Sequence, residues 1–408
     1  MNTKTFTVSL LAATALAGPL GTRGGVGHHS GSDSAYDDFC ARNNKSGMGS
    51  VQDYEERAQI FHNHQNEINE HNRGMGNSDP NGLKLKMNWT GDLTPEEYDQ
   101  LINLDNAAAE AKAASLDDPD QGLGLRMETA TNVDHFADGF MHPVKNQGSC
   151  GSCWTFSANT TLEGTLAKKQ NTSPVRISEQ QIVDCTLTTN PQNEIDFGKD
   201  YGAWGCSGGW MDYSWNFHKD QGYMYDSDYR YTARNEDCKH EPSKTKGNVT
   251  SYGQIRGTIQ DMKDKAMEQP LAVALNASSS AFRFYSSGVV RESDNCGSRL
   301  NHAVVVVGYS DGSDDGPSPP TPEQDCKVTK WWHTCEDRTD DRRRMQSSNQ
   351  NYWKVQNSWG TGWGDDGFIL IEIVGGDGVC GINKVVEWVE GTTDSDEDST
   401  EYTCWANG

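Results

Sequence analysis

The chain contains the stretch Gln147-Gly148-Ser149-Cys150-Gly151-Ser152-Cys153-Trp154. The spacing of the apolar residues after it predicts a helix that begins at this point; these residues are Trp154, Phe156, Leu162 and Leu166. Cys153 is therefore expected at a junction between a loop and a helix. A helix N-terminus and a nearby imidazolium both lower the pKa of a thiol and favour the thiolate. The stretch thus predicts that Cys153 is a nucleophile.

Two later segments supply the groups that a cysteine nucleophile needs, namely an imidazole that exchanges protons with it and a group that orients the imidazole. His302 stands at the start of an apolar, β-branched run over residues 303–307, which predicts a buried strand. Residues 352–360 supply a second strand, which ends in Asn357. We expect these rigid strands to hold His302 and Asn357 in place.

These three segments resemble the cysteine, histidine and asparagine motifs of the papain family of cysteine proteases, and the first one fits the family pattern Cys-Gly-[Ser/Ala]-Cys-[Trp/Tyr]. The resemblance implies that Cys153 is the nucleophile, His302 the acid and base, and Asn357 the orienting group. It also implies that Trp359 keeps water off the hydrogen bond between Asn357 and His302. By the same resemblance, the Gln147 amide and the backbone N–H of Cys153 stabilise the tetrahedral oxyanion.

The spacing of the motifs indicates two insertions. His302 follows Cys153 by about 150 residues, as is typical of the family, whereas Asn357 follows it by about 200. An insertion over residues 311–351, rich in proline and charge, accounts for the difference and is expected to be a surface excursion. Residues 186–205 are expected to form a second, longer-than-usual loop.

Two other interpretations apply to the same residues. Cys150 and Cys153 form a Cys-x-x-Cys pair, which also occurs in thioredoxin-like dithiols and as half of a zinc site. The chain has no second Cys-x-x-Cys, no spaced histidine pair and no adjoining βαβ pattern, so both are disfavoured. A secreted pseudoprotease would keep the fold and lose the activity, but all four catalytic positions are present.

The cysteine count predicts disulfides and one free thiol, because eleven is an odd number. The papain resemblance implies three pairs: Cys150 with Cys206, Cys185 with Cys238, and Cys296 with Cys380. If the first pair forms, Cys150 is not a redox partner for Cys153. Four cysteines fall outside the family pattern: Cys326 and Cys335 would close a short loop, and Cys40 and Cys404 remain.

A helical stripe over residues 53–72 precedes the cysteine motif. Steps of three and four residues separate its members, which are Asp53, Arg57, Phe61, His64, Ile68 and Asn72. This spacing is similar to the pro-segment motif of cathepsin L-like proteases, with Asp53 in place of the usual glutamate and His64 in place of an asparagine. Residues 88–98 resemble the second pro-segment motif, with Lys86 and Thr90 as departures. An ordinary amphipathic helical hairpin is the alternative.

The start of the chain predicts a signal peptide over residues 1–17. Lys4 precedes the apolar residues 6–16, and Ala15-Leu16-Ala17 is a small-x-small cleavage site. The secretory pathway is therefore implied, with a lysosome, a vacuole or the extracellular space as the destination. Six Asn-x-Ser/Thr sequons suit that route: Asn44, Asn88, Asn159, Asn171, Asn248 and Asn276.

Composition excludes some partners. A net charge of −24 argues against nucleic acid. No apolar run of about eighteen residues follows the start, so no membrane helix is expected. Residues 107–120, rich in alanine and acidic side chains, are expected to be a connector that a protease can cut.

The resemblance also implies a substrate site. Gly209 binds the backbone of an extended peptide, and Trp359 lies nearby. The walls and floor of the main specificity pocket are Trp210, Met211, Ala274 and Val385, with Asn301 beside them. Since these four are apolar, we expect an endopeptidase that prefers a bulky hydrophobic side chain two residues before the cut (P2).

The predicted fold is α+β, with two papain-like lobes, one helical and one β-barrel-like, and an N-terminal helical pro-domain. The expected parts are a signal peptide (1–17), an inhibitory pro-segment (18–129), a peptidase domain (130–388) and an acidic tail (389–408). The reaction is peptide-bond hydrolysis through a thioester acyl-enzyme. We expect a monomer that acts on polypeptides, is inhibited by its own pro-segment, and needs no metal or organic cofactor.

Overall fold

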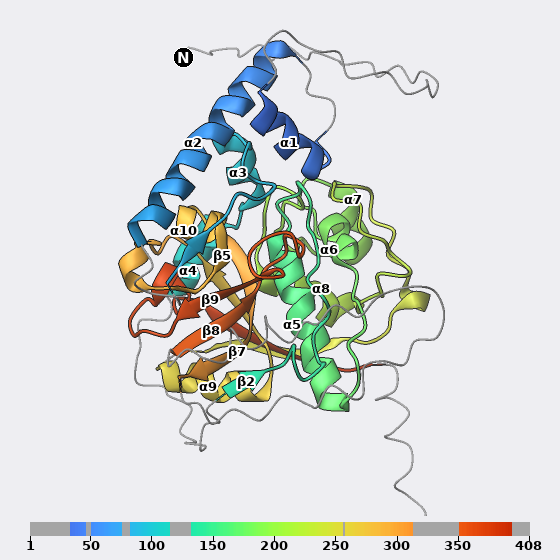
Figure 1. Cartoon of the computed structure of the whole chain (residues 1–408). Coiled ribbons are helices and arrows are strands. Elements are labelled where there is room, and N and C mark those ends of the chain that lie inside the picture. Colours follow the sequence, from blue (N-terminus) through green and yellow to red (C-terminus); the bar gives the residue numbers. More distant parts are fainter. Residues whose placement is uncertain are drawn as a thin grey trace, which may run out of the picture. The chain divides into compact units, whose positions relative to one another are not determined.

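The computed structural model describes residues 33–45, 50–75, 82–114, 132–255, 258–312 and 351–393 (Figure 1). The predicted signal peptide, nearly all of the insertion 311–351 and the tail beyond residue 393 lie outside the described residues. The chain divides into two units, residues 1–48 and 49–408. In the first unit, helix α1 (Ser34–Arg42) begins where the Asp33 side chain accepts hydrogen bonds from the N–H groups of Ala35 and Tyr36.

The second unit begins with the predicted helical stripe. It forms α2 (Val51–Met75), which is followed by β1 (Lys84–Leu85), α3 (Pro95–Leu101) and α4 (Asn106–Ala114). Arg57 on α2 donates to both oxygens of Glu97 on α3, at 2.8 and 2.7 Å, and to Asp53 one turn earlier at 3.0 Å. Asn72 exchanges two hydrogen bonds with the backbone of Leu85. These contacts hold α2, α3 and β1 together.

The helical lobe is built around α5 (Cys153–Gln170), which is buried on all sides over its first fifteen residues. Hydroxyl side chains allow this burial because they bond to carbonyls: Ser157 to Val304 at 2.8 Å, Thr161 to Ser157 at 2.8 Å, and Thr165 to Thr161 at 2.9 Å. The other elements of this lobe are α6 (Glu179–Cys185), α7 (Pro191–Phe197), α8 (Met211–Gln221) and the short 3₁₀ helix η2 (Pro242–Lys244).

The second lobe contains the sheet, which lies beside α5 (Figure 1). Its strands follow the order β3 (Val249–Ile255), β10 (Val386–Gly391), β4 (Leu271–Leu275), β7 (His302–Asp311), β8 (Asn351–Gln356), β9 (Phe368–Glu372) and β6 (Val289–Val290), and β2 (Asn132–Asp134) pairs with β7. Within the described residues β3 and β6 remain the two ends of this order, so the sheet does not close into the expected barrel-like form. The lobe also holds α9 (Ile259–Glu268), α10 (Ser280–Arg283), β5 (Tyr285–Ser287), η3 (Glu292–Asp294) and η4 (Val379–Gly381).

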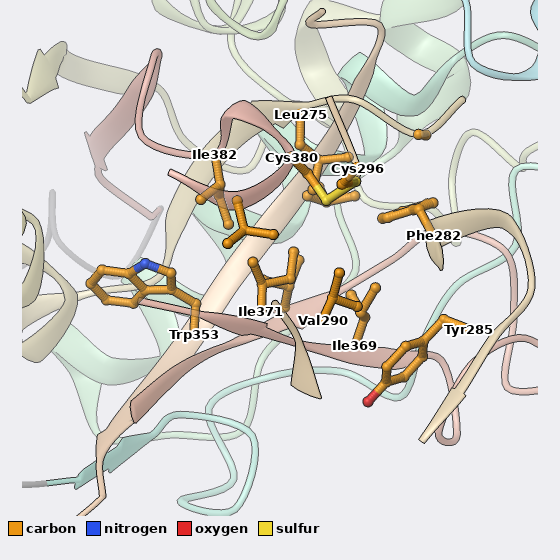
Figure 2. Packing of buried hydrophobic residues seen from close by; sticks show 14 of the residues in the cluster. Leu275, Phe282, Tyr285, Val290, Cys296, Trp353, Ile369, Ile371, Cys380 and Ile382 are labelled. Carbon is orange, nitrogen blue, oxygen red and sulfur yellow. A yellow bond between two sulfur atoms is a disulfide. The ribbon is translucent and has the colours of Figure 1, made fainter. Parts of the chain in front are cut away.

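Each lobe has its own hydrophobic core. The core of the β-rich lobe gathers side chains from the sheet, α10 and the Cys296–Cys380 disulfide (Figure 2). Leu83, Tyr98 and Leu101 of the pro-segment belong to the same core, and β1 pairs with β5. The pro-segment is therefore an integral part of this lobe's packing.

Two segments that are expected to link other elements contain helices. Residues 186–205 contain α7, which begins at Pro191 after an Asn190 side chain that accepts from the N–H of Gln192 at 3.1 Å. The first part of the expected connector, up to Ala114, is helical and belongs to α4. In both places the sequence that favours a helix is short, so the packing of the folded chain decides whether a helix forms.

The three disulfides implied by the papain resemblance are present: Cys150–Cys206, Cys185–Cys238 and Cys296–Cys380. The first removes Cys150 as a redox partner, so the dithiol interpretation of Cys150 and Cys153 is wrong. Cys153 is not in a disulfide. The pairs suggested for the four remaining cysteines involve Cys326, Cys335 and Cys404, which lie outside the described residues.

The sequons differ in exposure. Asn88, Asn159 and Asn276 are buried, and Asn159 is wholly inaccessible within α5. The side chains at the other three positions, Asn44, Asn171 and Asn248, are exposed. Since a glycan needs open solvent around its asparagine, only the last three fit the folded protein. Among the described residues, no helix has the length and apolar character that a bilayer crossing requires.

Candidate active site

Cys153 is the first residue of α5, as the sequence predicts. Backbone N–H groups of Cys153, Trp154 and Ala303 favour its thiolate. Burial has the larger and opposite effect, because Cys153 is 0% exposed, and it raises the pKa of the thiol to about 12. In this form of the protein Cys153 therefore carries a neutral thiol, in contrast to the thiolate expected from the helix N-terminus.

His302 and Asn357 are brought together by neighbouring strands. His302 begins β7, Asn357 follows β8, and these two strands pair antiparallel. His302 Nε2 lies 2.8 Å from Asn357 Oδ1. Trp359 packs its ring against this pair, with its centroid 5.0 Å from that of His302, and is itself buried. The sheet thus joins two residues that are far apart in the sequence.

The hydrogen bond between His302 and Asn357 fixes the tautomer of the imidazole. An amide oxygen only accepts, so His302 Nε2 carries the proton and donates it. In the neutral ring Nδ1 then has a lone pair, and this buried atom has no hydrogen-bond partner among the described residues. Burial lowers the pKa of His302 to about 4, although the bond to Asn357 opposes the shift. The imidazole is therefore neutral and ready to accept a proton at Nδ1.

The side chain of Gln147 is held in one orientation. Its Oε1 accepts a hydrogen bond from Ser358 Oγ at 2.6 Å, which leaves the amide nitrogen as a donor. That nitrogen donates to the Cys150 carbonyl at 2.9 Å and to the Leu101 carbonyl at 3.0 Å. Leu101 belongs to the predicted pro-segment. A pro-segment carbonyl thus binds the amide that the resemblance assigns to the oxyanion.

The predicted pro-segment continues across the same region. The N–H of Leu104 donates to the Asn301 carbonyl at 3.2 Å, and the N–H of Asp105 donates to the Gly209 carbonyl at 3.1 Å. The Gln100 and Asn103 side chains donate to two further backbone carbonyls at 2.7 Å each. Gly209 lies so close to Trp154 that a Cβ there would be 2.6 Å from the indole ring. Any side chain at position 209 would therefore collide with Trp154, so this close packing requires glycine.

The residues predicted to form the specificity pocket lie in one buried cluster. Trp210, Met211, Ala274 and Val385 are each 0% exposed and share this cluster with Cys153 and with Leu104 of the pro-segment. Asn301 lies at the same place, since its carbonyl binds Leu104. An apolar pro-segment side chain is therefore packed among the predicted pocket residues.

Sequence reasoning missed Arg283 on α10, a buried arginine that binds the pro-segment. Its guanidinium donates to the Thr90 carbonyl at 2.5 Å and stacks 4.0 Å from the Tyr98 ring centroid. The Asn88 side chain donates to the Arg283 carbonyl at 2.7 Å. Trp89 and Tyr98 also pack on Trp359 at 6.2 and 5.9 Å. No sequence motif around residue 283 indicates this role.

Among the side chains that the structure describes, no group of three or more His, Cys, Asp or Glu residues is placed to hold a metal ion. A zinc site built on Cys150 is excluded because Cys150 is in a disulfide.

Comparison with known families finds two matches along the chain. The family described as "Papain family cysteine protease" matches residues 129–389. The family described as "Cathepsin propeptide inhibitor domain (I29)" matches residues 36–98. The chain thus resembles a protease and its inhibitor in one polypeptide.

Individual proteins show the same similarity. Procathepsin L of Rattus norvegicus is 33% identical over 294 residues, which are 71% of this chain and 73% of the relative. Digestive cysteine proteinase 2 of Homarus americanus is 32% identical over 77% of this chain and 81% of the relative. Among solved structures, digestive procathepsin L 3 of the Tenebrio molitor larval midgut matches with a TM-score of 0.65 and 26% identity, covering 87% of this chain and 98% of that one.

Proposed function

Because this chain belongs to the papain family of cysteine proteases and carries its own cathepsin-type propeptide inhibitor domain, we propose that it is the zymogen of an endopeptidase that acts through a thioester at Cys153. The observation that carries the proposal is the 2.8 Å bond between His302 and Asn357, which leaves His302 Nδ1 able to take a proton. The pro-segment covers this site and inhibits it.

The proposed mechanism uses these groups in order. His302 Nδ1 takes the proton of Cys153, and the thiolate sulfur attacks the carbonyl carbon of the scissile bond. The oxyanion that forms is stabilised by the Gln147 amide and the backbone N–H of Cys153. His302 then gives its proton to the leaving amine, the C–N bond breaks, and a thioester remains. Water, deprotonated by His302, hydrolyses the thioester and restores the thiol.

Asn357 and Trp359 would act through His302. Asn357 keeps the imidazole in one tautomer and stabilises the imidazolium, while Trp359 keeps water away from their bond. The resemblance to the papain family supports these roles, as does the packing of Trp359 on His302. The two residues position the base and do not react themselves.

Removal of the pro-segment is expected to change the protonation of the pair. In the zymogen the thiol has a pKa of about 12 and the imidazole one of about 4, so both are neutral between these pH values. Burial causes both shifts, and it ends when solvent reaches the cleft. The thiol pKa should then fall and the imidazole pKa should rise, so that the thiolate–imidazolium pair forms near neutral pH.

Labelling with a peptidyl epoxide thiol-protease inhibitor tests this function. The chain without its predicted signal peptide is incubated at mildly acidic pH with reductant, and mass spectrometry follows both labelling and size. We expect Cys153 to be labelled only after the mass drops, because the intact zymogen covers the cleft and holds a neutral thiol. A folded, pro-segment-free protein that stays unlabelled would be a pseudoprotease and would refute the proposal.

The proposed preference is for a bulky hydrophobic P2 side chain. It is supported by the apolar character of Trp210, Met211, Ala274 and Val385, and by the packing of Leu104 among them. Asn301 and Gly209 would bind the substrate backbone there. The proposed P2 preference therefore follows from apolar burial rather than charge.

The variant Val385→Glu tests the floor of this pocket. A carboxylate there should raise kcat/KM for peptides with arginine at P2 by about tenfold or more relative to peptides with leucine. The ratio of the two kcat/KM values in one enzyme preparation is the measurement, so partial misfolding does not affect it. An unchanged ratio would show that Val385 is not the floor.

Further proposals about location, domain bounds and substrates rest on the sequence. We place the protein in the secretory pathway, with a lysosome, a vacuole or the outside of the cell as its destination. Residues 1–17 would be the signal peptide, 18–129 the pro-segment, 130–388 the peptidase and 389–408 the tail. The substrates would be polypeptides, and the enzyme would act as a monomer without a cofactor.

A further inference from the structure

One pro-segment lysine occupies an acidic site on the peptidase domain. Lys112 Nζ on α4 lies 2.6 Å from Asp212 Oδ2 and 3.3 Å from Glu387 Oε1. The same ammonium group lies 5.7 Å from the ring centroid of Trp210, within cation–π range. Asp212 is in the first turn of α8, Trp210 precedes that helix, and Glu387 is on β10. Side chains from α8, from the residue before it and from β10 thus surround one cation.

The site is built into the domain rather than formed by surface side chains. Glu387 is 1% exposed, and its Oε1 accepts from Trp210 Nε1 at 2.9 Å and from Gln254 Nε2 at 3.0 Å. Its other oxygen, Oε2, and Asp212 Oδ1 are buried and have no hydrogen-bond partner among the described residues. Burial raises the pKa of Glu387, and the charge of Lys112 opposes that shift.

Maturation removes the cation from this site. Lys112 precedes the start of the matched protease family at residue 129, so it leaves with the pro-segment. Asp212 and Glu387 remain on the peptidase side, as does Trp210. A buried carboxylate without a counter-charge is unfavourable, so the emptied site favours a new cation.

The position of the site relates it to the substrate. Lys112 follows Leu104 and Asp105, whose N–H groups bind the carbonyls of Asn301 and Gly209. Gly209 is the proposed binding point for substrate backbone, and it is adjacent in sequence to Trp210. The acidic site therefore adjoins the part of the cleft that receives the residues before the scissile bond.

We propose that Asp212, Glu387 and Trp210 form a cation subsite that Lys112 fills in the zymogen and that a lysine or arginine side chain of the substrate fills in the mature enzyme. This inference rests on the proposed endopeptidase function. The carboxylates bind the charge, and the Trp210 ring packs on the end of the basic side chain. The pro-segment thereby covers a specificity site as well as the catalytic residues.

Matched peptides that differ in a single charge test the subsite. Mature enzyme, made by processing of the full chain, is given pairs of peptides with lysine or uncharged norleucine at P3 or P4, and with leucine at P2 throughout. At one of these positions we expect kcat/KM to favour lysine by about tenfold or more. Asp212→Asn and Glu387→Gln should each bring this ratio close to one.

A control variant removes the same charge elsewhere on the same helix. Asp220 on α8 pairs with the exposed Lys199 at 2.9 Å, so Asp220→Asn should keep the lysine preference. The subsite is refuted if no position favours lysine, or if the preference survives both substitutions at Asp212 and Glu387. Failure of the proposed function itself is recognised separately, because then the norleucine peptides are not cleaved either. In that case, calorimetry measures the dissociation constants of the same peptide pairs for the mature protein. The inference predicts that the lysine peptide binds more tightly than the norleucine peptide by the same factor.

Discussion

Replacing Cys153 with alanine is expected to abolish peptide hydrolysis, with a loss in kcat of about ten-thousand-fold or more. Without the sulfur no thioester forms, and the remaining oxyanion donors give only weak catalysis. Steady-state hydrolysis of a peptide with leucine at P2 is the measurement. Cys153→Ser should be similarly inactive, because a serine hydroxyl has a far higher pKa than a thiol and His302 alone does not make it a comparable nucleophile.

Processing and catalysis are separated by adding a trace of active enzyme to the Cys153→Ala zymogen. We expect the variant to be trimmed to the mature mass and the mixture to hydrolyse the peptide no faster than the added trace of active enzyme does alone. Residual hydrolysis within about tenfold of the wild-type rate would show that Cys153 is not the nucleophile.

Replacing Lys145 with methionine is expected to destabilise the protein by about 3–5 kcal/mol. Lys145 Nζ binds Glu163 Oε1 at 2.7 Å and Glu179 Oε1 at 2.6 Å, and all three side chains are at most 5% exposed. The substitution keeps most of the side-chain volume but leaves two buried carboxylates without a cation. Urea unfolding of the zymogen in the Cys153→Ala background, which prevents self-digestion, measures the loss.

The stability that the Lys145→Met variant loses should also depend on pH. Burial raises the pKa of Glu163 and Lys145 lowers it, so the substitution raises it further. The folded variant then keeps a proton on Glu163 at pH values where the unfolded chain has released it. A group with a raised pKa in the folded state loses stability as pH rises above its ordinary value, so the loss at about pH 8 should exceed the loss at about pH 5.

An exposed ion pair provides the control for the buried one. Lys199 pairs with Asp220 at 2.9 Å, and their side chains are 47% and 38% exposed. Because solvent screens such a pair, Lys199→Met should change the free energy of unfolding by less than about 1 kcal/mol. Equal effects of the two substitutions would contradict the proposed importance of burial.

The sequence by itself determined the parts of the site that are encoded locally. The motif around Cys153 predicts a helix start, and the β-branched run after His302 predicts the strand that carries it. The residues before Asn357 likewise form the expected strand. The papain resemblance added the three disulfides and the inhibitory pro-segment, because those features have fixed positions relative to the motifs. Short segments with strong periodicity carry this information without any tertiary contact.

Only the tertiary structure decided the state of the site. The helix start alone favours a thiolate at Cys153, yet burial in the folded chain raises its pKa instead. The bond from Gln147 to Leu101 joins residues with no local relation in sequence, and so does the ion pair between Lys112 and Glu387. The physical reason is that desolvation and charge pairing depend on which distant segments exclude water from a group, and the order of residues along the chain does not specify this.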